Sequence, residues 1–89
     1  MDRYARALDR ATPALYARAD GKCELEHLGG CYGYLHRHHK LMRSQGGDSH
    51  ITNLLLVCDT HHRLIHAEPA MSYAMGWLIR RGSNDTENA

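Results

Sequence analysis

Residues 36–66 read HRHHKLMRSQGGDSHITNLLLVCDTHHRLIH, and the order of patterns in this stretch sets the expected architecture. β-Forming residues alternate through residues 32–39, which predicts a strand. Glycine and small polar residues mark a long loop over residues 40–53. Residues 54–57 are fully apolar, as in a short buried strand. The stretch therefore predicts a strand, a long loop, a second strand and then a helix.

This helix is predicted over residues 60–67, and a shorter one follows it. Asp59 is the candidate N-cap of the first helix. Pro69 suits the first turn of the second helix, and Gly76 suits its end. Residues 77–79 are expected to pack as a short extended segment.

The N-terminal part of the chain is predicted to be helical in two pieces within residues 2–19. Thr12 followed by Pro13 is typical of an N-cap with proline at the first helical position. Residues 1–22 are interpreted as a helical brace that packs on a small core. Residues 83–89 are small and polar, which predicts a disordered tail.

The composition indicates one small domain that needs stabilisation beyond its hydrophobic core, for example by a bound metal. The 89 residues include 8 His and 3 Cys but no Phe, so few large side chains can fill a core. Three Cys cannot all pair within one chain, and no secretory signal precedes them, so metal binding in a reducing compartment is expected. No apolar run is long enough to span a membrane. The net charge of +1 means that any affinity for nucleic acid must come from local patches or from a metal.

Histidines are spaced for metal binding in the predicted helix. His62 and His66 are four residues apart, so their rings lie on one helical face and can reach one ion. The alternative is two surface histidines on a polar helix. His61 points elsewhere, and it lies three residues after Cys58, as in a zinc knuckle. The two neighbouring histidines should therefore serve different sites.

Three further histidines lie in the first predicted strand. Alternation puts His36 and His38 on one face and His39 on the other. Of two neighbouring histidines at the end of a strand, one can bind a metal ion while the other takes a proton from water. His36 is interpreted as an exposed or hydrogen-bonded strand residue.

The order His38-His39, Asn53 and then His62-x-x-x-His66, with a Cys-x-x knuckle before it, resembles the HNH endonucleases. The resemblance covers residues 23–79 and is strongest to the short HNH proteins of bacterial viruses. It implies an α+β fold, a small ββα-metal domain with N-terminal helices and a structural zinc knuckle. Residues 23–82 would be the nuclease domain.

The resemblance also implies roles for single residues. His39 would be the general base, and Asn53 would hold the loop and orient that base. His38, His62 and His66 would bind one catalytic divalent metal, which could be Mn, Ni, Zn, Co or Mg. The implied activity is hydrolysis of phosphodiester bonds in DNA, by nicking or double-strand cleavage, with little intrinsic sequence specificity.

A structural zinc site is implied beside the catalytic one. Many relatives carry four Cys around the motif, whereas this chain has Cys23, Cys31 and Cys58. The fourth ligand would be His61, at the knuckle spacing, or His27, four residues after Cys23. Three Cys and one His form an accepted zinc ligand set.

DNA is the expected partner, contacted through basic residues that flank the site. These candidates are Arg37, Lys40, Arg43 and Arg63. The resemblance further implies a cytoplasmic protein of a bacterial host cell, with terminase subunits as possible partners in phage DNA packaging. The alternative function is a non-catalytic, zinc-stapled DNA-binding module or terminase-associated adaptor.

Overall fold

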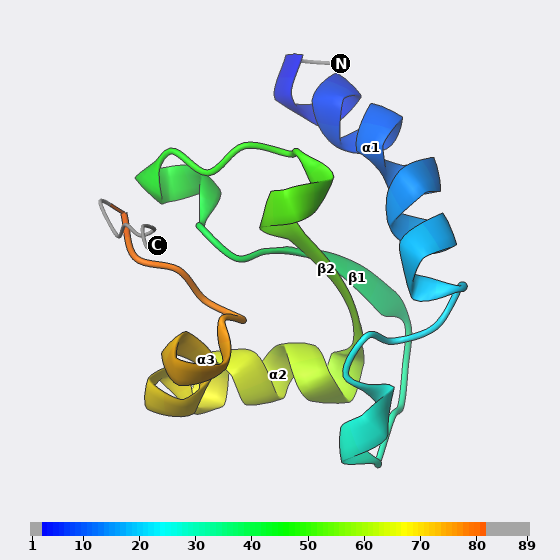
Figure 1. The fold of residues 1–89 in the computed structure, drawn as a ribbon, viewed down its shortest axis with the longest axis vertical. Helices are drawn as coiled ribbons and strands as arrows, with labels where there is room; N and C mark the ends of the chain where they lie inside the picture. The colour runs from blue at the N-terminus through cyan, green and yellow to red at the C-terminus, as the bar shows by residue number, and fades with distance from the viewer. Residues whose placement is uncertain (1–2, 82–89) are drawn as a thin grey trace.

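The computed structural model describes residues 3–81, in which a two-stranded sheet lies between helices (Figure 1). The helices and strands follow in the order α1 (Arg3–Ala19), β1 (Leu35–His39), β2 (Leu54–Cys58), α2 (Asp59–Ala67) and α3 (Pro69–Met75). The α+β prediction is confirmed. The predicted tail, residues 83–89, lies outside the described residues.

The two strands are antiparallel and pair along their full length. The register runs from Leu35 opposite Cys58 to His39 opposite Leu54. Residues that face each other across a ladder lie on the same side of the sheet. Arg37 and His39 therefore share one face with Leu54, and His36 and His38 share the other with Val57, as alternation predicted.

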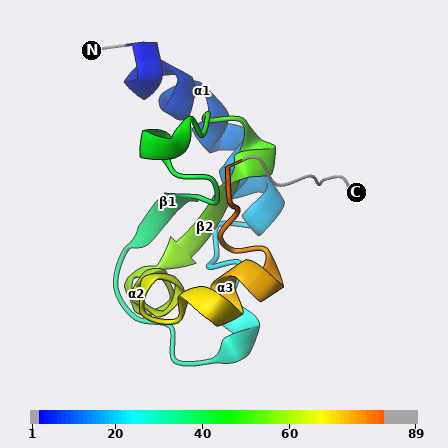
Figure 2. The ribbon, with the colours of Figure 1, turned by 90° about the vertical axis from the view of Figure 1, so that its left-hand side faces the viewer.

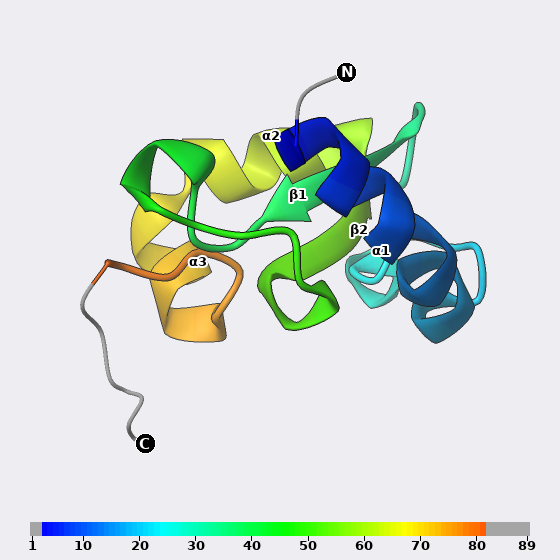
Figure 3. The same cartoon turned by 90° about the horizontal axis from the view of Figure 1, so that it is seen from above.

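Helices cover the two faces of this sheet. Figure 2 shows α1 on one side of the strands and α2 with α3 on the other, and the view from above in Figure 3 shows the same order. Leu15 of α1 packs against Leu54 and Leu56. On the opposite face, Ile65 of α2 packs against Val57.

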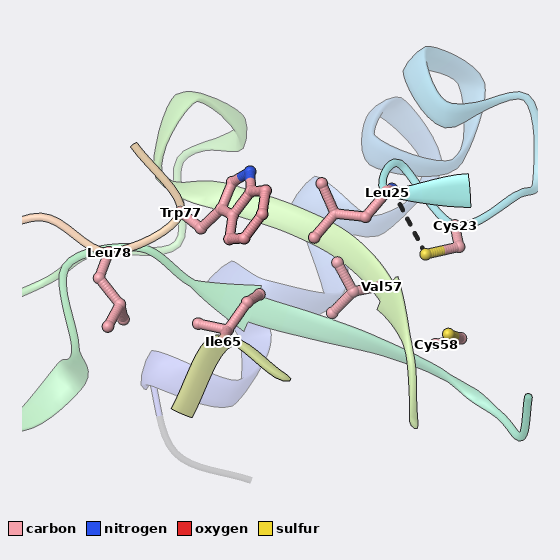
Figure 4. Close-up of a cluster of buried hydrophobic side chains, with 7 residues drawn as sticks. All are labelled: Cys23, Leu25, Val57, Cys58, Ile65, Trp77 and Leu78. Atoms are coloured by element: carbon pink, nitrogen blue, oxygen red, sulfur yellow. Dashed lines mark hydrogen bonds between the residues drawn. The ribbon is translucent and has the colours of Figure 1, made fainter. Parts of the chain in front are cut away.

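The buried side chains form two clusters, and the larger one includes two thiols (Figure 4). Its members come from the loop after α1, from β2, from α2 and from the segment after α3: Cys23, Leu25, Val57, Cys58, Ile65, Trp77 and Leu78. Within residues 3–81, no helix is both long and apolar enough to cross a bilayer.

The prediction of two N-terminal helical pieces is wrong, because α1 continues through Pro13 as one helix. Thr12 does not cap a second helix. Its hydroxyl donates to the carbonyl of Leu8 at 2.8 Å. An interior proline costs about 3 kcal/mol, and burial of the helical face that carries Leu8, Leu15 and Ala19 against the sheet offsets this cost.

Two further boundaries differ from the sequence prediction. β1 begins at Leu35 and not at Tyr32, because the preceding loop is tied to the start of α2 through the N–H of Thr60, which donates to the carbonyl of Tyr32. Asp59 is the first residue of α2 and not its N-cap. The N-cap is Cys58, whose sulfur accepts from the backbone N–H of His61 at 3.5 Å.

Residues 69–76 fold as predicted, whereas residues 77–78 form a bend and not an extended segment, because the N–H groups of both donate to the carbonyl of Ser72. α3 begins at Pro69, and Gly76 ends it in the left-handed conformation with φ of 80°, which glycine adopts without steric cost. Trp77 and Leu78 are buried. The N–H of Ile79 donates to the carbonyl of Lys40, which joins this segment to the end of β1.

An ion pair that the sequence did not reveal fastens α1 to the sheet. Arg18 donates to both carboxylate oxygens of Glu24, at 2.9 and 2.7 Å, and to the carbonyls of Ile51 and Leu54. Glu24 also accepts from the N–H of Leu56 at 2.9 Å. Burial opposes the charged form of Glu24, but these donors lower its pKa below the ordinary value.

We expect Glu24→Gln to lower the free energy of unfolding at pH 7 by about 1.5–3 kcal/mol, the range for hydrogen bonds to charged groups. Because the pKa of Glu24 is lower in the folded chain, its contribution is complete above about pH 4.5 and is lost as the pH falls further. The difference between the two proteins should therefore shrink on acidification. Urea titrations at several pH values measure it. Glu26→Gln, which removes an exposed carboxylate, is the control, and an equal loss in that variant would contradict the assignment.

Candidate functional site

Three histidines converge on the α2 side of the sheet. His38 comes from β1, and His62 and His66 come from α2, one turn apart. One ring nitrogen of each lies within 4.8 Å of the others, and the ring centroids are 5.0–5.5 Å apart. Three imidazoles at this spacing can bind one metal ion. The structure thus brings together the three residues predicted to bind a catalytic metal.

His38 is the most firmly held member of this triad. Its ring is buried, and Nε2 donates to the carbonyl of Trp77 at 2.8 Å. This outer hydrogen bond leaves Nδ1 as the ligand atom. Burial lowers the pKa of His38 to about 4, and burial and then His66 lower the pKa of His62. Both rings are therefore neutral near pH 7, which is the form that binds metal.

A histidine–carboxylate pair flanks the triad. The ring of His36 stacks on that of His62, with centroids 4.9 Å apart, and His36 Nε2 pairs with a carboxylate oxygen of Asp59. The other oxygen of Asp59 accepts from the N–H of Tyr34 at 3.2 Å. The pair with His36 is the main cause that lowers the pKa of Asp59. This engagement explains why Asp59 does not cap α2, and it agrees with the interpretation of His36 as a hydrogen-bonded strand residue.

His39 belongs to the opposite face of β1 but reaches the same pocket, because it is the last residue of the strand. The pocket has a volume of about 430 Å³. It is lined by Arg37, His38, His39, Met42, Arg43, Ser44, His62 and His66. Burial and then Arg43 lower the pKa of His39. A neutral imidazole beside three potential metal ligands is suited to accept a proton from water.

Asn53 closes the loop that follows His39. Its side-chain oxygen accepts from the N–H of Leu41 at 2.9 Å. Its amide donates to the carbonyls of Leu41, at 3.1 Å, and of Asp48, at 2.8 Å. Gly47 lies in the same loop, where a Cβ atom would collide with the carbonyl oxygen of Leu41. The side chain of Asn53 therefore links Leu41, near the start of the loop, to Asp48. Its role in orienting His39 stays a prediction.

Two of the four predicted DNA contacts lie at the pocket. Arg37 and Arg43 are among its lining residues, and Arg37 also donates to Asp9 and to Thr12 of α1. Lys40 and Arg63 are not among the lining residues. Burial and then Arg18 lower the pKa of Lys40.

A second cluster joins the loop after α1 to the start of α2. It consists of Cys23, Cys31, Cys58 and His61, whose ligand atoms lie within 4.8 Å of one another. His61 Nδ1 is 3.3–3.5 Å from the three sulfur atoms. A tetrahedral zinc ion separates sulfur and nitrogen ligands by about 3.5 Å, given its bond lengths. The cluster can therefore hold a structural metal such as zinc, and His61, not His27, is its fourth member.

The surroundings of this cluster suit metal binding. His61 Nε2 lies 2.9 Å from the carbonyl of Gly29, which orients Nδ1 toward the thiols. Burial opposes the Cys58 thiolate, but the backbone N–H groups of His61 and Tyr32 lower its pKa to about 6. Desolvation and the neighbouring thiols raise the pKa of Cys31 to about 12. A bound cation would relieve this crowding by stabilising all three thiolates.

Three residues with clear roles in these sites were missed from the sequence. Trp77 acts through its backbone carbonyl, which leaves no sequence signal. Asp59 was interpreted only as a cap. Ser49, whose hydroxyl contacts His39, was interpreted only as a loop marker. A polar residue in a glycine-containing loop is too common to be singled out without coordinates.

Comparisons with protein-family models, with curated proteins and with solved structures found no match to this chain.

Proposed function

We propose that this chain is a metal-dependent HNH endonuclease that hydrolyses phosphodiester bonds in DNA. The observation that carries the proposal is the histidine triad beside His39 in one pocket with two arginines. The order β1, β2, α2 supports it, because a ββα unit supplies the proton acceptor and one ligand from a strand and two ligands from a helix. Arg37 and Arg43 give the pocket the positive charge that a phosphate needs.

The residues divide the reaction between them. Arg37 and Arg43 bind phosphate oxygens and hold the strand over the pocket. His39 takes a proton from water as the water oxygen bonds to phosphorus and the bond to the 3′ oxygen breaks. The leaving oxygen takes up a proton from solvent, so the products carry 5′-phosphate and 3′-hydroxyl ends. Asn53 keeps the loop closed and His39 in place.

The triad would hold one divalent ion. When bound, that ion supplies a Lewis acid that stabilises charge developing on the phosphate oxygens. Neutral imidazoles leave its full positive charge available. Three nitrogen ligands favour Zn, Ni, Co or Mn over Mg, which prefers oxygen.

The proposal is tested with supercoiled plasmid and with protein that has been dialysed free of metal at the triad while the cluster of Cys23, Cys31, Cys58 and His61 keeps its zinc. We expect nicking that depends on added Mn, Ni, Co, Zn or Mg and that is weakest with Mg. His62→Ala should lower the metal affinity of the triad by at least about 100-fold, since one of three ligands is lost, and nicking should fall with it. Calorimetry and gel assays measure the two effects.

His27→Ala is the matched control, because His27 is exposed and outside both clusters. It should leave metal binding and nicking unchanged. No nicking by the wild-type chain with any metal would refute the proposal. That result would favour the non-catalytic DNA-binding module or terminase-associated adaptor.

A further inference from the structure

Two aromatic side chains stand in water in the loop before β1. Tyr32 is 79% exposed and Tyr34 is 85% exposed, whereas no other large apolar side chain among residues 5–81 is more than 57% exposed. Neither ring adds to the hydrophobic core. Tyrosine is enriched where proteins meet their partners, because it combines a large apolar ring with a polar tip. The two rings are therefore available to contact a partner.

The backbone that carries these rings is fixed at both ends against the start of α2. The carbonyl of Tyr32 accepts from the N–H of Thr60 at 3.4 Å. The N–H of Tyr34 donates to the carboxylate of Asp59 at 3.2 Å. Between them, Gly33 has φ of 85°, and a Cβ atom there would collide with the same carboxylate. The loop thus presents both rings on a fixed support, which lowers the entropy cost of binding.

The residue that holds this loop also begins a stripe along α2 that ends at the pocket. Positions i, i+3, i+4 and i+7 of a helix share one face, and here they are Asp59, His62, Arg63 and His66. His62 and His66 line the pocket. At 1.5 Å per residue, Asp59 lies about 10 Å from His66 along the helix axis. The tyrosines and the pocket are therefore joined by one face of α2.

Positive charge lies along this path. Arg63 is exposed, and it follows Asp59 by one helical turn. Arg37 and Arg43 line the pocket itself. A DNA strand that leaves the pocket along α2 therefore meets a cation for its phosphates before it reaches the tyrosines. At about 3.4 Å per nucleotide, a path of about 10 Å corresponds to about three nucleotides.

The chemistry of the two rings selects the form of the DNA. In a duplex, the bases are stacked on one another, and proteins reach only their edges in the grooves. An aromatic side chain binds the face of a base, as in proteins that bind single strands. Such stacking is tolerant of sequence, because every base has an aromatic face. Two fixed, exposed rings beside a phosphate-binding path therefore fit bases that are unpaired.

We propose that Tyr32 and Tyr34 form a stacking surface for unpaired bases, so that the substrate is DNA with unpaired nucleotides beside the cleaved bond. This inference rests on the proposed nuclease function and names its substrate class. The strand runs from the pocket along α2 past Arg63, and its bases meet the rings about three nucleotides from the cleaved phosphate.

Binding without cleavage provides the first test. The protein keeps zinc in the cysteine cluster, and the triad is left without metal so that no bond is cut. Fluorescence anisotropy compares a short labelled single strand with the duplex of the same sequence. We expect the single strand to bind more tightly than the duplex. Tyr32→Leu and Tyr34→Leu should each raise the Kd for the single strand by about 5- to 150-fold, the effect of losing one stacked base.

Matched variants separate stacking from other contacts. Tyr32→Phe and Tyr34→Phe keep an aromatic ring and should bind the single strand as the wild type does. Tyr16→Leu is the control, because Tyr16 is an exposed tyrosine of α1 outside the pocket. Unchanged Kd values in the Leu variants would overturn the proposal and would leave the rings for a protein partner. Equal losses in the Phe and Leu variants would also overturn it, since the hydroxyls would then make the contact.

Cleavage with Mn²⁺ provides a second test. The substrates are a duplex with a central unpaired stretch and the same duplex fully paired. For the wild type, kcat/KM should be at least about tenfold higher with the unpaired stretch, and the double variant with both leucines should lose this preference. Equal cleavage of both substrates by the wild type would overturn the substrate class while the nuclease function stands. If the wild type cuts neither, the nuclease function is refuted, whereas the binding measurements still decide the stacking surface.

Discussion

Replacing His39 with alanine should abolish DNA nicking while both metal sites stay filled. His39 lines the pocket of the triad but is not one of its three ligands. Its loss therefore removes the proton acceptor without removing a metal ligand. General-base catalysis commonly contributes about 10²–10⁴-fold, so the rate of nicking should fall by that factor. Plasmid assays give the rate, and elemental analysis of the same preparation gives the metal content.

Two comparisons separate this result from a folding defect. His39→Ala should keep the thermal stability of the wild type within a few degrees, because His39 is only half-buried. Free imidazole added to the variant should restore part of the rate by filling the space left by the ring. Cleavage at the wild-type rate by His39→Ala would refute the assignment of the base. Loss of the metal together with the rate would instead identify His39 as a ligand.

The histidine pattern made much of the candidate site predictable. Alternation in a strand and the four-residue repeat of a helix are local rules, and they separated His38 from His39 and His61 from His62 correctly. The knuckle spacing from Cys58 favoured His61 but left His27 open, and the structure places His61 with the three cysteines. Each of these inferences needs only a few neighbouring residues.

Contacts between distant parts of the chain could not be predicted in this way. Arg18 pairs with Glu24 and with carbonyls more than thirty residues away, and the carbonyl of Trp77 orients His38 across a separation of 39 residues. Pro13 was interpreted as a boundary because its local cost is clear from sequence, while the packing that offsets this cost depends on β2. Tertiary packing therefore decided the points on which local rules failed.

The structural zinc should account for most of the stability of the fold. Two of its predicted ligands, Cys23 and Cys58, are also members of the larger buried cluster. Without a cation, the thiols of buried Cys23 and Cys58 and of exposed Cys31 would crowd the ring of His61. Structural zinc contributes about 10–16 kcal/mol in zinc-finger peptides, whereas a small domain has a net stability of about 5–15 kcal/mol. Removal of this zinc should therefore unfold the chain at 25 °C, which circular dichroism measures during titration with a strong chelator.

Substitutions of His61, the proposed fourth zinc ligand, test whether the loss of stability comes from this cluster. His61→Ala should lose the zinc and lower the free energy of unfolding by at least about 5 kcal/mol, since one of four ligands and the hydrogen bond to Gly29 disappear together. His61→Cys should retain zinc, because four thiolates also form a tetrahedral site. His27→Ala should match the wild type, because the ring of His27 is exposed and outside the cluster. The prediction would be wrong if His61→Ala folded normally and kept one tightly bound zinc while His27→Ala did neither. That result would identify His27 as the fourth zinc ligand.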